Sequence, residues 1–135
     1  MDDHVSDAYC ALLREVKRTT MIKRQWFMIN YIKDPSEEVQ LAAVTQKADT
    51  IYDIKTPSEA VQLAAVTQDW GSAIEYIKDP SEEVQLAAVA QFGCAIRYIT
   101  DPSEQVQLAA VRQTKYAFKY IKNPCEQVRE TFYYV

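Results

Sequence analysis

Apolar residues along the chain recur at helical spacing and predict pairs of short helices. Val84, Ala87 and Ala88 lie at i, i+3 and i+4, and further apolar residues widen this stripe. The segment before it, residues 73–77, has an Ala-Ile-x-Tyr-Ile pattern that fits a helix of only about two turns. The pattern therefore predicts a unit in which a short helix leads into a longer one.

The longer helix belongs to a segment that recurs along the chain. Residues 80–89 are repeated with small changes at residues 35–44, 57–66 and 102–111, and a broken copy begins at Pro124. The prolines that open these copies are separated by 22, 23, 22 and 22 residues. A fixed period of this length is typical of stacked repeats, because one unit cannot bury its apolar face alone. The alanine pair in each copy predicts close approach of neighbouring helices.

Each longer helix begins at an Asp-Pro-Ser-Glu sequence or a close variant. We expect Asp34, Asp79 or Asp101 to cap the free amides and the following proline to take the first helical position. Glutamates follow in the first turn, where the helix dipole favours negative charge. These acids are predicted to be structural rather than catalytic; they are Glu37, Glu38, Glu59, Glu82, Glu83 and Glu104.

The two ends depart from the repeat. Residues 1–24 place apolar side chains at Tyr9, Leu12, Leu13 and Val16 after a capping Ser6, and predict an N-terminal capping helix with a polar outer face. Residues 25–123 carry the repeats. In residues 124–135 charged side chains replace the recurring apolar ones, which predicts a C-terminal cap.

Three aromatic residues close the chain. We expect Phe132, Tyr133 and Tyr134 to pack back on the stack, the alternative being an exposed tail that binds a partner. Together, these expectations describe one domain, residues 1–135, with an all-α fold: a right-handed α-solenoid of five to six short two-helix repeats with a cap at each end.

The repeated sequence Tyr-Ile-Lys-Asp-Pro-Ser-Glu-Glu-Val-Gln-Leu-Ala-Ala-Val, residues 76–89, resembles the core of a HEAT repeat. HEAT units span about 40 residues, whereas these units span 22 or 23 and are closer to leucine-rich-variant repeats. The resemblance covers residues 25–135. It implies a short helical repeat like those in bacterial and phage proteins, and it carries no catalytic residues.

Composition fits a soluble helical protein. The chain has 135 residues, of which 48% are hydrophobic and 25% charged, and only 2 glycines. Its three cysteines are far apart and form no Cys-x-x-Cys pair, which favours reduced thiols in a cytoplasmic protein. We identify neither a membrane span nor an export signal.

Charge is distributed unevenly along the chain. Residues 1–33 carry a net charge of +2, residues 34–111 of −9 and residues 112–135 of +3. An acidic middle disfavours nucleic-acid binding, which needs clustered positive charge. The acids are expected to form a solvated face, with a functional acidic surface as the alternative.

Residues that stay the same between units are expected to hold the stack together. One glutamine ladder comprises Gln40, Gln62, Gln85 and Gln107, and a second comprises Gln46, Gln68, Gln91 and Gln113. Side-chain amides can donate and accept, so at least one ladder is predicted to be structural, with a polar ligand track as the alternative. A tyrosine ladder at Tyr31, Tyr76, Tyr98 and Tyr120 is interrupted by Asp53.

Residues that vary between units are the candidates for partner binding. Trp70 and Phe92 occupy equivalent positions, and aromatic side chains dominate binding hot spots. Their alternative role is to fill local gaps beside Gly71 and Gly93. The predicted partner-binding residues are Trp70, Phe92, Tyr116, Tyr52, Arg97 and Glu75.

Catalytic chemistry finds little support in the sequence. His4 is the only histidine, no glycine-rich phosphate loop is present, and no base is evident for a cysteine nucleophile. We predict no catalytic, cofactor or metal site. The sequence favours a non-enzymatic protein-binding module whose partner is a protein. The first alternative is a phage-type inhibitor whose acidic surface occupies a basic or nucleic-acid-binding site on a host defence protein. The second is a self-associating structural subunit.

Overall fold

Alternating α-helices and 3₁₀ helices make up the computed structural model, which describes residues 3–68 and 70–133. The α-helices are α1 (Asp3–Arg24), α2 (Glu37–Gln46), α3 (Glu59–Gln68), α4 (Glu82–Gln91), α5 (Glu104–Gln113) and α6 (Glu126–Tyr133). The 3₁₀ helices between them are η1 (Trp26–Tyr31), η2 (Ala48–Asp53), η3 (Ser72–Tyr76), η4 (Gly93–Tyr98) and η5 (Lys115–Tyr120). The prediction of an all-helical chain is confirmed for the described residues, which contain no strand.

The short helix of each unit is 3₁₀ rather than α. A 3₁₀ helix has three residues per turn, so side chains at i and i+3 point the same way. In η2 and the residue after it, Ala48, Ile51 and Ile54 follow this spacing and all three are buried. Ile54 also donates its backbone N–H to the Ile51 carbonyl at 3.1 Å before the chain turns extended. A helix with three residues per turn therefore places these three side chains together on the core side.

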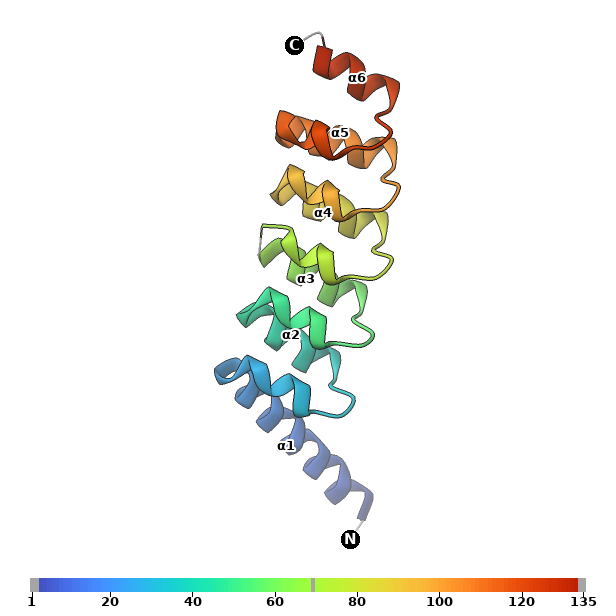
Figure 1. The fold of residues 1–135 in the computed structure, drawn as a ribbon. Helices are drawn as coiled ribbons and strands as arrows, with labels where there is room; N and C mark the ends of the chain where they lie inside the picture. Colours follow the sequence, from blue (N-terminus) through green and yellow to red (C-terminus); the bar gives the residue numbers. More distant parts are fainter. Residues whose placement is uncertain (1–2, 69, 134–135) are drawn as a thin grey trace.

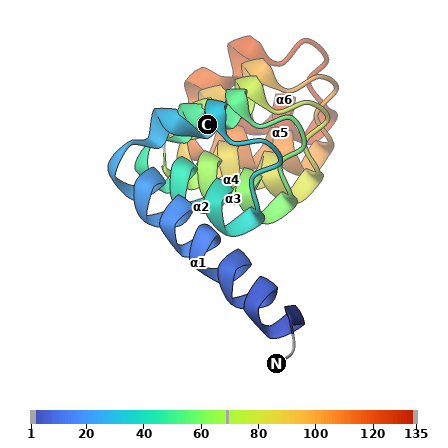
Figure 2. The same cartoon turned by 90° about the horizontal axis from the view of Figure 1, so that it is seen from below.

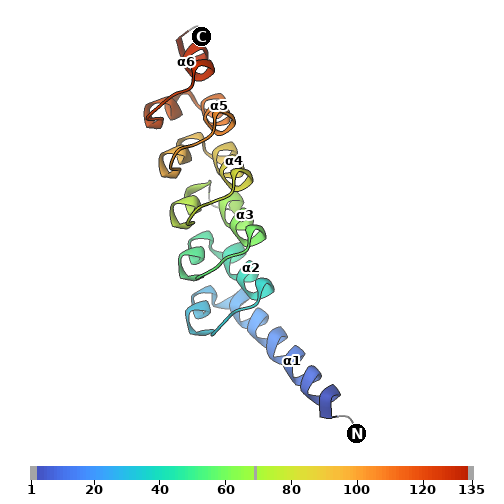
Figure 3. The ribbon, with the colours of Figure 1, turned by 90° about the vertical axis from the view of Figure 1, so that its right-hand side faces the viewer.

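The elements form two layers with the core between them. The α-helices run along one side and the 3₁₀ helices along the other (Figure 3). Consecutive units lie one on the next from α1 to α6, with the loops that enter the α-helices at one edge (Figure 1). Each inner α-helix buries the same valine and alanine positions, as in Val84, Ala88 and Val89 of α4. Within the described residues no helix is long and apolar enough to cross a membrane.

Small residues allow the units to approach closely, as predicted from the alanine pairs. The second alanine of each pair is fully buried; these are Ala43, Ala65, Ala88 and Ala110. A Cβ atom added to Gly71 would lie 2.4 Å from the Ala88 carbonyl oxygen of the next unit. A Cβ atom added to Gly93 would lie at the same distance, 2.4 Å, from the Ala110 carbonyl oxygen. Backbone contact between units leaves no room for a larger residue at these positions.

A serine hydroxyl joins each of the helices α2 to α5 to the helix before it. Ser81 is the N-cap of α4, and its Oγ accepts a hydrogen bond from the Val84 N–H at 3.3 Å. The same hydroxyl donates to Glu59 Oε1 in α3 at 2.5 Å. The arrangement recurs between Ser58 and Glu37 and between Ser103 and Glu82, both at 2.5 Å, and between Ser36 and Glu15. We call this set of bonds the serine–glutamate ladder.

The predicted helix start is wrong by two residues. Serine is the N-cap, and the proline and aspartate precede it outside the helix. Asp34, Asp79 and Asp101 instead have φ of 50, 50 and 53°. This left-handed conformation is one that aspartate tolerates better than most residues, and it turns the loop toward the next helix. The prediction that glutamates occupy the first turn is confirmed.

The N-terminal helix has two different halves. Its second half takes the place of a repeat helix, because Glu15 accepts the hydrogen bond from Ser36 and Ile22 is fully buried. Its first half extends away from the stack (Figures 1 and 2). The expected polar outer face is wrong, since Leu12 and Val16 are 61% and 55% exposed and Leu13 is also exposed. The side chains of Ser6 and Tyr9 lie outside the described part.

The C-terminal aromatic residues differ in how they pack. Phe132 stacks on Phe118 with ring centroids 4.0 Å apart, which confirms the predicted packing for this residue. Tyr133 meets the same rings edge-on but stays exposed. Tyr134 lies outside the described residues.

Removing one hydroxyl of the serine–glutamate ladder is predicted to destabilise the fold. Ser81→Ala removes both a helix cap and a bond to the preceding unit, so we expect about 1–2 kcal/mol less free energy of unfolding. Urea unfolding of Ser81→Ala, Glu59→Gln and the double variant measures the coupling between the two side chains. Glu83→Gln changes an exposed acid in the same turn and is the matched control. A Ser81→Ala effect no larger than that of the control would contradict the role of the ladder.

Candidate partner-binding surface

The structure separates the six predicted partner-binding residues into two groups, all of them exposed. Trp70 and Phe92 lie in the turns that follow α3 and α4. Tyr52, Glu75 and Arg97 are each the penultimate residue of a 3₁₀ helix, and Tyr116 is the second residue of η5. The first group thus belongs to the edge where the α-helices end, and the second to the 3₁₀ layer.

The turn after α3 displays its tryptophan. Trp70 has φ of 51° and is followed by Gly71 with φ of 75°, and the Gly71 N–H bonds back to the Val66 carbonyl at 3.1 Å. The Trp70 side chain is 74% exposed, whereas the space beside Gly71 is taken by the backbone of Ala88. Trp70 therefore does not fill a gap in the stack. Asp69 lies outside the described residues.

Phe92 occupies the equivalent turn after α4, which is one residue shorter. It is the C-cap of α4 in an extended conformation, and its side chain is 42% exposed. Gly93 beside it donates its N–H to Gln113 Oε1 of the next unit at 2.8 Å. The glutamine and the Ala110 backbone fill the space around Gly93, so part of the phenyl ring remains available to a partner.

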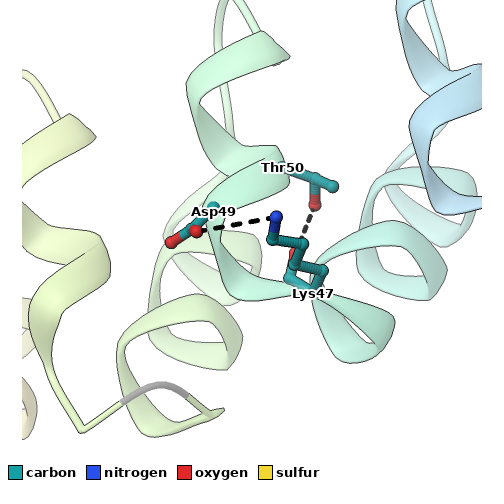
Figure 4. Close-up of polar contacts among 3 residues, drawn as sticks. All are labelled: Lys47, Asp49 and Thr50. Atoms are coloured by element: carbon teal, nitrogen blue, oxygen red, sulfur yellow. Dashed lines mark hydrogen bonds and ion pairs between the residues drawn. The ribbon is translucent and has the colours of Figure 1, made fainter.

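Two units before Phe92, the same position holds a lysine. Lys47 Nζ lies 3.9 Å from Asp49 Oδ2, and the Thr50 hydroxyl donates to the Lys47 carbonyl at 2.6 Å (Figure 4). The ammonium also lies 4.6 Å from the Trp26 ring centroid. A ring and a carboxylate thus position this cation at the surface, although an exposed ion pair adds little stability.

The 3₁₀ layer carries a line of tyrosine rings with cations on them. Tyr52 meets Tyr76 edge-on with centroids 5.6 Å apart. The Arg97 guanidinium carbon lies 4.5 Å from the Tyr98 ring centroid and 5.9 Å from that of Tyr120. Its Nη2 donates to the Tyr98 hydroxyl at 2.5 Å, and this hydrogen bond raises the pKa of Arg97. The guanidinium is therefore charged at any physiological pH and held by the chain itself.

The predicted structural use of a glutamine ladder is confirmed. In the first ladder each side-chain amide donates to the carbonyl of the proline that opens its own unit, at 2.8–3.1 Å, for Gln40, Gln62, Gln85 and Gln107. Gln107 Oε1 also accepts the Cys125 N–H at 2.9 Å, which links two units. These glutamines stabilise the loops that open the units.

Clefts at the loop edge are the feature that the sequence did not reveal. Three of them lie between the loops of consecutive units, with volumes of about 230, 510 and 350 Å³. The largest includes Tyr31, Gln40 and Asp53. Its only signal in the sequence is the interruption of the tyrosine ladder at Asp53.

Groups that bind metals are not gathered anywhere in the described residues, which hold no cluster of three or more histidine, cysteine, aspartate or glutamate side chains. Cys10, Cys94 and Cys125 are free thiols. No family model, curated protein or solved structure matches the chain.

Proposed function

We propose that the chain is a non-enzymatic protein-binding module of the cytoplasm, a right-handed α-solenoid of five to six HEAT-like or leucine-rich-variant-like units. The observation that carries the proposal is the division between fixed and varied positions. The repeated positions include side chains that are buried or bonded to a neighbouring unit, as in Val84, Ala88 and Ser81. Positions that differ between units face solvent and include large aromatic side chains, with Trp70, Tyr52 and Tyr116 at 74%, 72% and 76% exposed.

Exposed aromatic side chains on a preformed framework favour protein binding. Tryptophan and tyrosine are enriched among residues that dominate binding energy. A surface held in place by its scaffold loses little conformational entropy when a partner binds. Trp70 and Phe92 lie one unit apart along the same edge and are our first anchors for the partner. Tyr52, Glu75, Arg97 and Tyr116 provide further varied contacts on the 3₁₀ layer.

The phage-type inhibitor is the alternative, and it requires free acidic groups for a basic site. One glutamate per unit along the inner stack already accepts a serine hydroxyl from the next unit; these are Glu37, Glu59 and Glu82. The remaining acids, such as Glu38 and Glu83, are exposed. The two functions differ in how binding responds to salt, because contacts between exposed charges are screened and apolar contacts are not.

Replacing the two edge aromatics is predicted to weaken partner binding without unfolding the chain. The double variant Trp70→Ala, Phe92→Ala should lose at least about tenfold in affinity, the usual effect of a binding hot spot. Its free energy of unfolding should change by less than about 1 kcal/mol, because both side chains are substantially exposed. The partner is first isolated from lysate on immobilised wild-type chain, and the affinity is then measured by calorimetry at low and high salt.

Gln105→Ala, Gln127→Ala is the matched control, because both glutamines are exposed in first turns of α-helices. The control should bind like wild type. A partner that is released by salt but retained by the aromatic variant would overturn the proposal and support the acidic inhibitor.

Self-association is a second candidate function, favoured by the exposed face of α1. Leu12, Leu13 and Val16 are exposed to solvent near the middle of α1. Adjacent exposed apolar side chains on a helix favour pairing with another helix. A second copy of the chain would bury this face against its own α1. Tyr133 at the opposite end is also exposed and offers a weaker site for the same purpose.

Charge on this face is predicted to abolish self-association. Leu12→Glu should give a monomer at concentrations where the wild-type chain is a dimer, as measured by sedimentation equilibrium. Ala11→Glu adds the same charge at an exposed neighbour and is the control that should remain dimeric. A wild-type chain that stays monomeric at every concentration, or an equal loss in both variants, would contradict this candidate.

A further inference from the structure

A cleft recurs between the loops of consecutive units, and in one copy, which we call the filled cleft, Arg97 of the chain itself forms part of the wall. The cleft between the fourth and fifth 3₁₀ helices is lined by Arg97, Tyr98, Gln107 and Tyr120 among others. Arg97 places its guanidinium 4.5 and 5.9 Å from the two tyrosine ring centroids. A planar cation over an aromatic ring is attracted by the negative face of the ring. The chain therefore holds a guanidinium against the tyrosine rings of this cleft.

The equivalent cleft between the first and second 3₁₀ helices, which we call the open cleft, has no arginine among its lining residues. By repeat register Asn30 stands where Arg97 stands, Tyr31 where Tyr98 stands, and Asp53 where Tyr120 stands. All three line the cleft, whose volume is about 510 Å³ against 230 Å³ for the filled copy. A shorter side chain in place of arginine and a carboxylate in place of the second ring leave this space open.

The open cleft offers a ring face and acceptors. Tyr31 is 80% exposed, so its ring is accessible. Asp53 adds an exposed carboxylate, the group that matches the donor fork of a guanidinium. Gln40 also lines the cleft, and its Oε1 is buried without a hydrogen-bond partner among the described residues. Guanidinium has five donors and no acceptor, and it is the side-chain group that best fits this combination.

Lysines on the wall do not exclude a cation. Lys33 and Lys55 line the open cleft together with Asp34 and Asp53, so its formal charge is balanced. Lys122 lines the filled cleft at the position equivalent to Lys55, and that cleft nevertheless contains Arg97. The long lysine side chains can keep their ammonium groups in solvent while a guanidinium lies on the ring.

We propose that the cleft formed by Tyr31, Asp53 and Gln40 binds an arginine side chain of a partner protein. The guanidinium lies over the Tyr31 ring and pairs with the Asp53 carboxylate, as Arg97 lies over Tyr98 in the filled copy. This inference deepens the proposed function by naming the chemistry that a partner presents at one cleft. The arginine-binding proposal rests on the proposed function only in taking the arginine from a partner protein.

The test uses N-acetyl-arginine amide as the probe and needs no partner protein, so it can fail or succeed independently of the proposed function. Titration into ¹⁵N-labelled chain should shift the side-chain amide of Gln40 and the backbone amides of Asn30 and Asp53 in a saturable way. N-acetyl-citrulline amide, which has the same shape without the charge, should cause no comparable shift. Asp53→Asn should lower the affinity about three- to fivefold through loss of the exposed ion pair.

Two further variants exchange the filled and open clefts. Asn30→Arg, Asp53→Tyr rebuilds the filled arrangement in the first cleft and should abolish the shifts at Gln40. Arg97→Ala empties the other cleft and should create a second set of shifts at Tyr98 and Tyr120. No saturable shift at Gln40 in the wild-type chain, an equal response to citrulline, or unchanged binding in the rebuilt cleft would each overturn the proposal.

Discussion

The hydrogen bonds of one serine hydroxyl per unit are the constraint on which the rest of the structure depends. Ser81 Oγ accepts a hydrogen bond from the Val84 N–H of its own helix and donates one to Glu59 of the helix before it. A hydroxyl can do both because it carries one donor and two acceptor sites. The bond fixes how far one unit lies from the next, and this spacing brings the Ala88 carbonyl against Gly71 and buries the valines between the layers. Cys125 replaces the serine in the last unit.

A framework held by repeated positions leaves the other positions free to differ. Each 3₁₀ helix has buried positions, such as Thr50 and Ile51, and exposed positions that hold tyrosine, glutamate or arginine, as at Tyr52, Glu75 and Arg97. The surface therefore changes from unit to unit while the spacing does not. Arg97 shows that such changes also act within the molecule, because its charge lies on the tyrosine rings of two units. Binding and internal packing thus use the same kind of contact on this layer.

Much of this fold could be predicted from period and apolar spacing, because both depend on local sequence. The helix pairs, the buried alanines and the structural glutamines followed directly from repetition. The capping residue did not, since Asp34 and Ser36 are both good caps and the choice depends on contact with Glu15 in another unit. The outer face of the N-terminal helix was expected to be polar, but helical spacing alone does not reveal which part of α1 the stack covers. The clefts and the position of Arg97 depend on distances between units, and sequence spacing alone does not fix those.

Native-state hydrogen exchange is the measurement that shows whether the serine–glutamate ladder makes the units unfold cooperatively. The amides to follow are those donated to the serine hydroxyls, Val39, Val61, Val84 and Val106, and the equivalent Val128 after Cys125. The account predicts that the first four exchange only through large-scale opening of the stack and that Val128 exchanges much faster. Equal protection of Val128, or rapid and independent exchange at the four serine-capped helices, would contradict it.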